Sequence, residues 1–68
     1  MTNNIGNIQK VGHQRRLGKI VNDIRQSKFF GDRAGLKADR ARLDGYLQAL
    51  EEEGLIDHEA VMKVMEAN

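Results

Sequence analysis

The sequence contains no cysteine, no proline and no tryptophan, and it has only one tyrosine and two phenylalanines among its 68 residues. The absence of cysteine excludes a disulfide framework, a thiolate metal site and a thiol nucleophile. The scarcity of aromatic side chains leaves little from which an apolar ligand pocket could be built. A chain of this length buries only about 60% of the surface that its unfolded form exposes, so its core is small. The composition therefore favours one small domain with no cofactor and no small-molecule substrate.

Groups that could carry catalysis or bind a metal are equally sparse. His13 and His58 are the only histidines, and neither has the neighbouring His or carboxylate spacing of a zinc site. Ser27 is the only serine and Thr2 the only threonine, and neither has a histidine in a sequence context typical of an activated nucleophile. A glycine-rich phosphate loop ending in Gly-Lys-Ser or Gly-Lys-Thr is also missing from the sequence. We therefore expect a protein that is not an enzyme.

Long hydrophobic runs are missing, and the charges are unevenly distributed. No apolar run approaches the roughly 18 residues that a membrane span requires, which predicts a soluble, cytoplasmic protein without membrane contact. Residues 1–40 carry nine cations and three acids, a net charge of +6, whereas residues 41–68 carry two cations and seven acids, a net charge of −5. This asymmetry between the two halves indicates a charged partner.

What the sequence does contain is helical periodicity. One apolar stripe with the spacing i, i+3, i+4, i+7 consists of Leu17, Ile20, Val21 and Ile24. It predicts a helix from Gly12 or His13 to about Lys28, closed by Gly31 in the left-handed conformation. The apolar residues before this stripe project to the opposite side of the same helical wheel. Residues 1–11 are therefore expected to form a flexible, partly disordered N-terminal arm.

Two further helices are predicted by caps and apolar spacing. Asp32 is expected to cap a second helix that runs to about Glu53. Gly54 is expected to end that helix, and Asp57 to cap a third. The predicted inward faces are Leu36, Leu43, Leu47 and Leu50, with Tyr46 at the margin, in the second helix and Val61, Val64 and Met65 in the third. The sequence thus predicts an all-α fold, a single three-helix domain over residues 12–68.

The connection between the second and third helices carries a family resemblance. The matching positions are Leu47, Leu50, Gly54, Ile56, Asp57, Glu59, Val61 and Met65. This pattern resembles the helical hairpin of the bacterial short C-terminal domain family (SHOCT), whose signature reads L-x-x-L-x-x-x-G-x-I-[TSD] before an acid-rich helix start. The sequence departs from the family at Ala60, where Glu is usual, so the reciprocal capping box is missing. The resemblance implies a non-catalytic module for oligomerisation or for contact with nucleic acid or protein.

The charges of the predicted second helix run against its dipole. Its first turns carry Arg33, Lys37 and Arg40, and its last turn carries Glu51, Glu52 and Glu53. Each misplaced exposed charge costs about 0.3 to 1 kcal/mol, so selection for folding alone would not choose this arrangement. Either the basic start of the first helix neutralises the glutamates in an antiparallel pair, or the glutamates face a basic surface on a partner protein. The sequence leaves both alternatives open.

The adjacent residues Phe29 and Phe30 supply a second candidate contact. Neighbouring residues on a helix point about 100° apart, so we expect one ring in the core and the other partly exposed, unless both cover the end of the core. An exposed Phe30 beside Arg33 would suit a protein-binding hot spot. The candidate partner-binding residues are therefore Phe30, Arg33, Glu51, Glu52 and Glu53.

The first predicted helix offers a different partner. Its candidate nucleic-acid-binding residues are Arg15, Arg16, Lys19, Asn22 and Gln26, cations and amides that can contact phosphates and base edges. Three observations oppose this interpretation. Asp23 interrupts the face, the sequence pI of about 8.1 is lower than that of dedicated DNA-binding domains, and residues 29–50 do not fit the register of a helix-turn-helix motif.

Together these features predict a small helical interaction protein, an adaptor or inhibitor of the size found among phage and plasmid accessory proteins. We expect it to form a homodimer and to bind another protein. A homodimer is expected because five apolar residues have no place on the three inward faces: Ile5, Ile8, Val11, Phe30 and Met62. The alternative function is a nucleic-acid-binding regulator that uses the basic N-terminal half.

Overall fold

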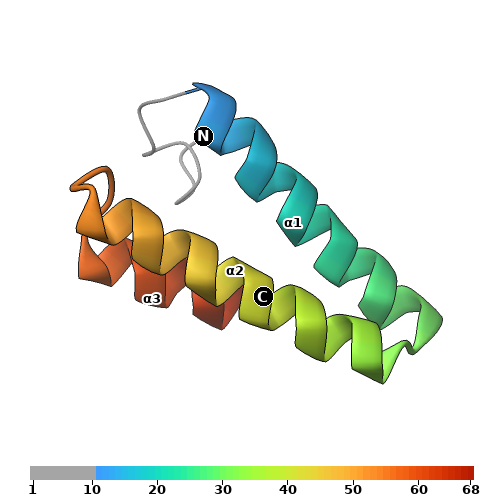
Figure 1. Cartoon of the computed structure of the whole chain (residues 1–68). Helices are drawn as coiled ribbons and strands as arrows, with labels where there is room; N and C mark the ends of the chain where they lie inside the picture. The colour runs from blue at the N-terminus through green and yellow to red at the C-terminus, as the bar shows by residue number, and fades with distance from the viewer. Residues whose placement is uncertain (1–10) are drawn as a thin grey trace.

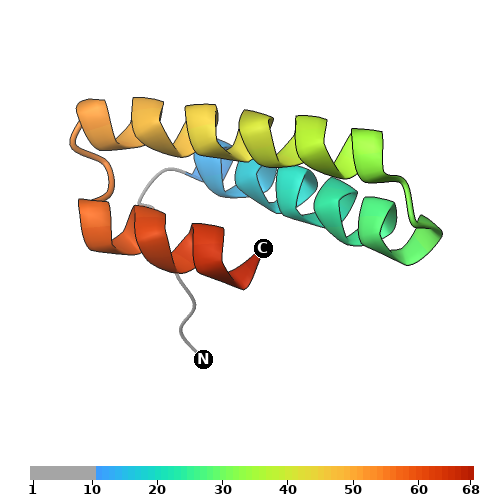
Figure 2. The ribbon, with the colours of Figure 1, turned by 90° about the horizontal axis from the view of Figure 1, so that it is seen from below.

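The structure is a computed structural model that describes residues 11–68. These residues form three helices, α1 (Val11–Phe30), α2 (Arg33–Glu52) and α3 (His58–Ala67). α1 and α2 form a long antiparallel hairpin (Figure 1), and α3 folds back along the second half of α2 (Figure 2). No strand occurs in residues 11–68, so the predicted all-α, three-helix fold is confirmed. The predicted N-terminal arm lies outside the described residues, except that Val11 is already the first residue of α1.

The first connection is a tight turn closed by Gly31, as the sequence predicts. Gly31 has a φ of 69°, which an L side chain would disfavour. The amide of Gly31 donates to the carbonyl of Lys28 at 3.2 Å, and the amide of Asp32 donates to the carbonyl of Ser27 at 2.9 Å. This pair of hydrogen bonds is the Schellman motif, which satisfies the last carbonyls of α1. α1 ends at Phe30, two residues later than the periodicity predicts.

The second connection repeats the same geometry. Gly54 has a φ of 75°, its amide donates to the carbonyl of Glu51 at 2.9 Å, and the amide of Leu55 donates to the carbonyl of Leu50 at 3.0 Å. The predicted end of α2 at Gly54 is therefore confirmed. The turn reverses the chain so that the apolar side chains after it can pack back against the core.

Both predicted helix caps are present. The carboxylate of Asp32 accepts a hydrogen bond from the amide of Gly35 at 2.9 Å, and the carboxylate of Asp57 accepts one from the amide of Ala60 at 2.8 Å. Both capping residues have extended backbone conformations, as residues before a helix should. The amino ends of α2 and α3 are therefore set by local sequence.

The core lies between the three helices and consists entirely of aliphatic side chains. Its buried residues are Leu17, Ile20, Val21 and Ile24 from α1, Leu43, Leu47 and Leu50 from α2, and Val61 and Val64 from α3. All of them lie on the predicted inward faces. Leu36, Tyr46, Leu55, Ile56 and Met65 are partly buried around this cluster. Within residues 12–68 no polar or charged side chain is buried.

Polar contacts at the margin of the core hold α1 against α2. Arg42 pairs with Asp23 at 3.3 Å, and the hydroxyl of Ser27 donates to the carboxylate of Asp39 at 3.0 Å. Nearer the amino end of α1, the ring of His13 contacts the hydroxyl of Tyr46. These contacts link successive turns of two antiparallel helices, and they fix how far one helix is shifted along the other.

The expectation for Phe29 and Phe30 is wrong. Neither ring enters the core, since Phe29 is 83% exposed and Phe30 is 77% exposed. The reason is that α1 continues helically through both residues and turns only at Gly31. One and two turns beyond Ile24, the inward stripe falls on positions 27, 28 and 31, so the two rings project away from α2.

Candidate interaction surfaces

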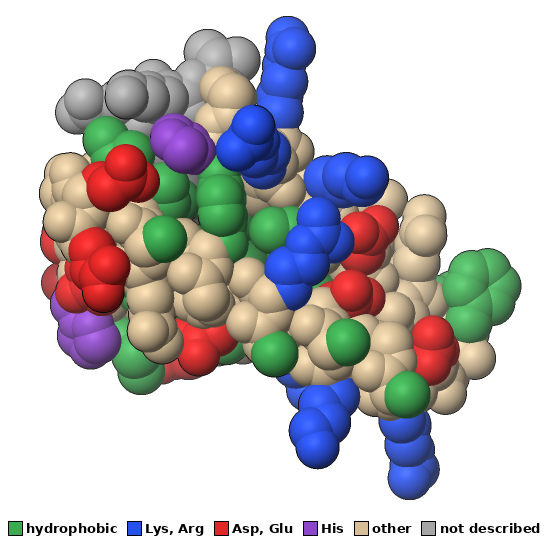
Figure 3. All heavy atoms as spheres, in the orientation of Figure 1, with side chains coloured by type: hydrophobic (Ala, Val, Ile, Leu, Met, Phe, Trp, Pro, Cys, Tyr) green, Lys and Arg blue, Asp and Glu red, His purple; other side chains and the backbone are tan. Residues whose placement is uncertain are grey.

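The hairpin end carries a pair of exposed aromatic rings that we call the aromatic tip, formed by Phe29 and Phe30 with the cations Lys28 and Arg33. The two rings pack edge to face, with centroids 5.1 Å apart and an interplanar angle of 85°. A hydrophobic lobe projects from one end of the molecule in Figure 3. Burying a phenylalanine side chain is worth about 1.5 to 3 kcal/mol. Two adjacent rings left in water therefore offer a large favourable free energy to a binding partner.

Two exposed cations flank the rings of the tip, and a hollow lined in part by three aspartates lies at the base of Phe30. Lys28 and Arg33 are exposed, and neither forms an ion pair with any residue of the described segment. The nearest acid in sequence, Asp32, is occupied as the cap of α2. Beneath Phe30 lies an open hollow of about 280 Å³ whose lining includes Asp23, Gln26, Ser27, Asp32 and Asp39. The tip therefore combines an apolar contact with free cations and a polar hollow at its base.

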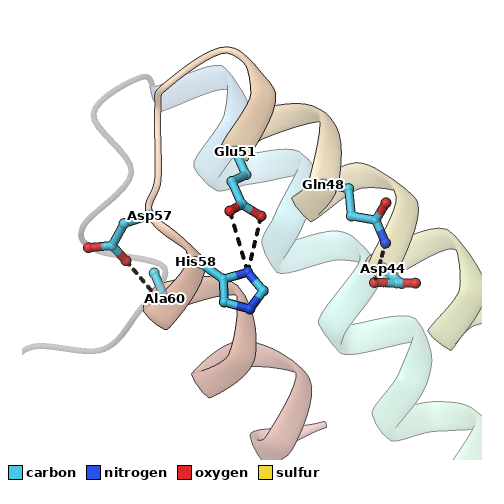
Figure 4. A network of polar contacts seen from close by, with 6 residues as sticks. All are labelled: Asp44, Gln48, Glu51, Asp57, His58 and Ala60. Atoms are coloured by element: carbon cyan, nitrogen blue, oxygen red, sulfur yellow. Dashed lines mark hydrogen bonds and ion pairs between the residues drawn. The ribbon is translucent and has the colours of Figure 1, made fainter.

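The predicted acidic group lies at the other end of α2. The carboxylate of Glu51 contacts the ring of His58 at 3.4 Å across the turn (Figure 4). Glu52 and Glu53 are exposed and form no ion pair within residues 12–68. Between α2 and α3, an adjacent hollow of about 320 Å³ is lined in part by Met62 and Met65. Only one of the three glutamates is thus partnered by the described part of the fold.

The basic start of α1 does not neutralise these glutamates directly. The contact of His13 with Tyr46 places the first turns of α1 beside the later turns of α2. Arg15, Arg16 and Lys19 are nevertheless exposed, and no ion pair joins them to the glutamates in the described part of the chain. Neutralisation by direct pairing, the first of the two alternatives, is therefore not found there.

The predicted partner-binding residues do not form one site. Phe30 and Arg33 flank the start of α2, whereas Glu51, Glu52 and Glu53 lie at its end. Twenty helical residues at 1.5 Å each separate the two groups by about 30 Å. The predicted set therefore splits into two surfaces, which can contact different molecules or different parts of one large partner.

A further surface, a groove between α1 and α2, escaped the sequence analysis. It has a volume of about 510 Å³. Its lining residues are Arg16, Lys19 and Ile20 from α1 and Ala41, Arg42, Gly45, Tyr46 and Ala49 from α2. The sequence signal for this groove is the spacing of alanine and glycine along α2. Apolar side chains and a glycine form its floor, and three cations form its rim.

No group of three His, Cys, Asp or Glu side chains is placed to hold a metal ion within residues 11–68. Lys63 donates to the carboxylate of Glu59 at 2.9 Å, and this contact raises the pKa of the Lys63 ammonium. That pair is exposed on α3. None of the three described helices combines the length and the apolar composition needed to cross a bilayer.

Comparison with known proteins identifies no relative. No family model, no curated protein and no solved structure matches the chain. The resemblance of residues 47–65 to the SHOCT hairpin therefore stays a prediction. Function has to be argued from the surfaces themselves.

Proposed function

We propose that this protein is a small, non-enzymatic helical module that self-associates and binds another protein through its aromatic tip. The observation that carries the proposal is the exposure of Phe29 and Phe30, at 83% and 77%. Interfaces are enriched in aromatic residues and arginine at the positions that contribute most to affinity. Because these rings are exposed, they contribute little to the stability of the fold. Their size and apolar character suit them to contact with a partner.

The charges of α2 support the same proposal. Arg33 and Lys37 lie in the first turns of α2 and Glu51 and Glu52 in its last, where each opposes the helix dipole. Arg33, Lys37 and Glu52 have no ion-pair partner in the described segment that would offset this loss. A partner of opposite charge would offset it. At the tip, the matching surface is an apolar pocket bordered by carboxylates.

Replacing both rings tests the tip. Phe29→Ser with Phe30→Ser is expected to lower partner capture about tenfold or more, because a hot-spot aromatic side chain contributes about 2 kcal/mol. The fold should survive, since both rings are exposed and their removal leaves no cavity.

Arg33→Glu should also lower capture, yet it should raise the free energy of unfolding by about 0.3 to 1 kcal/mol by complementing the dipole of α2. The measurement is affinity capture from nuclease-treated lysate of the cells that express the protein, followed by thermal unfolding of each variant.

Met62→Ser is the matched control, because Met62 is an exposed apolar residue on a different helix, at 47%. It should leave capture unchanged. Glu52→Lys with Glu53→Lys tests the acidic end of α2 in the same assay. Capture that survives the loss of both rings but disappears with the two lysines would refute the tip and move the contact to the acidic end.

A nucleic-acid-binding regulator is the second candidate. The observation that favours it is a row of exposed cations and amides along α1: Arg15, Lys19, Asn22 and Gln26. At 100° per residue these side chains share one side of the helix. Arg16 lies beside them on the rim of the groove. Such a row could follow a phosphate backbone.

Salt dependence tests this second candidate. If Arg15, Arg16 and Lys19 each neutralise one phosphate, log affinity for duplex DNA should fall with log salt at a slope of about −2.7 per protomer. Arg15→Ala with Arg16→Ala should then flatten the slope by about 2. Fluorescence anisotropy of labelled duplex at several salt concentrations measures both quantities. We expect no submicromolar binding at physiological salt, and a tight complex that depends on the two arginines would favour the regulator instead.

A further inference from the structure

The side of α2 opposite its buried leucines is lined by small residues. They are Ala34, Ala38, Ala41, Gly45 and Ala49, and all five are exposed. Figure 3 looks onto this side, where small hydrophobic side chains appear at intervals along α2 with cations around them. Three of the five, at positions 41, 45 and 49, also form part of the floor of the groove between α1 and α2. The groove and this side of α2 together form one continuous surface, which we call the small-residue face.

Packing within the chain does not explain the glycine in this face. A Cβ atom built on Gly45 would meet no atom of the described residues within 4 Å, so alanine would fit there among them. Glycine in the middle of a helix is less stable than alanine. Small side chains allow a second helix to pack closely. The distance between the two helix axes can then be about 8 Å, at the lower limit of the usual 8 to 10 Å. The face is therefore shaped for a helix from outside the described chain.

The charges of α2 indicate that the helix on this face is the α2 of a second copy. Its first half, residues 33–42, carries four cations and one acid, a net charge of +3, and its second half, residues 43–52, carries three acids and no cation, a net charge of −3. A second α2 laid antiparallel would place each half against the half of opposite charge and would also align the two helix dipoles favourably. A parallel copy would place like charges together along the whole length.

We infer that the small-residue face is the interface with a second copy of this chain, with the two α2 helices packed antiparallel about a two-fold axis near position 41. This inference deepens the self-association in the proposed function and depends on it. The register follows from the spacing of the small residues, because Ala38 then lies opposite Gly45 of the partner subunit, and Ala34 opposite Ala49 of the partner subunit. The small side chains of Ala34 and Ala38 of the partner subunit then lie over the groove.

One flank of the two helices supplies matching charges. At 100° per residue, Lys37 and Asp44 border the small-residue face on one side, and Arg42 and Tyr46 border it on the other. In an antiparallel pair related by a two-fold axis, each flank meets the same flank of the other copy. Lys37 therefore lies near Asp44 of the partner subunit, and the reciprocal pair forms at the other end. On the other flank Arg42 lies near Arg42 of the partner subunit, and the ion pair of Arg42 with Asp23 at 3.3 Å within each copy offsets this contact between like charges. The groove cations Arg16 and Lys19 lie on the opposite flank from Lys37, so they do not face the lysine of the other copy.

A charge exchange tests the interface. Lys37→Glu and Asp44→Lys each replace two attractive contacts per dimer with two repulsive ones, and each is expected to raise the dimer dissociation constant about tenfold or more. An equimolar mixture of the two variants should restore the dimer. In the mixed dimer, the substituted side chain of one variant has the opposite charge to the substituted side chain of the other, so the two attract. The second contact joins the unchanged Lys37 of one variant to the unchanged Asp44 of the other. Sedimentation velocity at tens of micromolar, with the wild-type chain alongside, measures all four samples. Neither side chain is in the core, and thermal unfolding checks that each variant is folded.

Ala41→Glu is a second variant that keeps the test decisive if Asp44→Lys does not fold. Position 41 is exposed and lies near the two-fold axis, so the new carboxylates would meet one another and give a monomer. Gln26→Glu adds the same charge on the outer side of α1 and should leave the dimer intact. A monomeric wild-type chain would overturn both self-association and this interface. A wild-type dimer that tolerates all the α2 variants would overturn only the interface, and the capture assay on the aromatic tip stays independent of either result.

Discussion

Leu47→Ala is expected to lower the free energy of unfolding by about 2 to 5 kcal/mol. Leu47 is 0% exposed and lies in the second half of α2, within the cluster that joins all three helices. Removing its isopropyl group loses the transfer free energy of those three carbon atoms and leaves a cavity that the nine buried residues of the described core have little means to fill. Native domains have total stabilities of about 5 to 15 kcal/mol, and a small core places this one near the lower end. Much of the variant should therefore be unfolded at 25 °C, as measured by urea titration followed by circular dichroism.

Met62→Ala is the control for this result, because it shortens an apolar side chain that is half exposed on α3. Its effect should stay within about 0.5 kcal/mol, as for most surface substitutions. If Leu47→Ala kept the wild-type urea midpoint and slope, Leu47 would not be a core residue. The leucines of α2 would then have to be interpreted as a docking face.

Gly54→Ala is expected to lower the free energy of unfolding by about 1 to 2 kcal/mol. Gly54 has a φ of 75°, a conformation in which a Cβ atom approaches the following carbonyl oxygen too closely. No other atom of the described chain lies within 4 Å of that Cβ, so the loss comes from backbone conformation alone. A large part of the second turn depends on this residue, because its amide and that of Leu55 satisfy the last carbonyls of α2.

The same change at Gly18 should have the opposite sign. Gly18 lies within α1 with helical backbone, and a Cβ atom there would also meet no atom of residues 11–68 within 4 Å. Gly18→Ala is therefore expected to raise the free energy of unfolding by about 1 kcal/mol. Chemical denaturation of the two variants beside the wild-type chain gives the comparison. Equal effects at the two positions would mean that Gly54 does not hold a left-handed turn in solution.

Local sequence determined the helices, their caps and their inward faces. Asp32 and Asp57 could be identified as caps because a capping carboxylate bonds to an amide three residues later, a distance that does not depend on the rest of the fold. Gly31 and Gly54 could be identified as helix ends because a positive φ is nearly free only for glycine. The buried faces followed from the 3.6-residue period, which fixes the residues that share a side of a helix once the helix exists.

The tertiary structure alone decided which of the remaining surfaces are covered. Phe29 and Phe30 lie on the last turn of α1, and their exposure depends on whether α2 turns back before or after them, which no local rule specifies. The glutamates at the end of α2 could be recognised as a charge cluster, but the contact of Glu51 with His58 requires the path of the second turn. The groove between α1 and α2 depends on how far each helix is rotated about its own axis. That rotation is set by the packing of the aliphatic side chains of all three helices together, so the period of one helix contains no information about it.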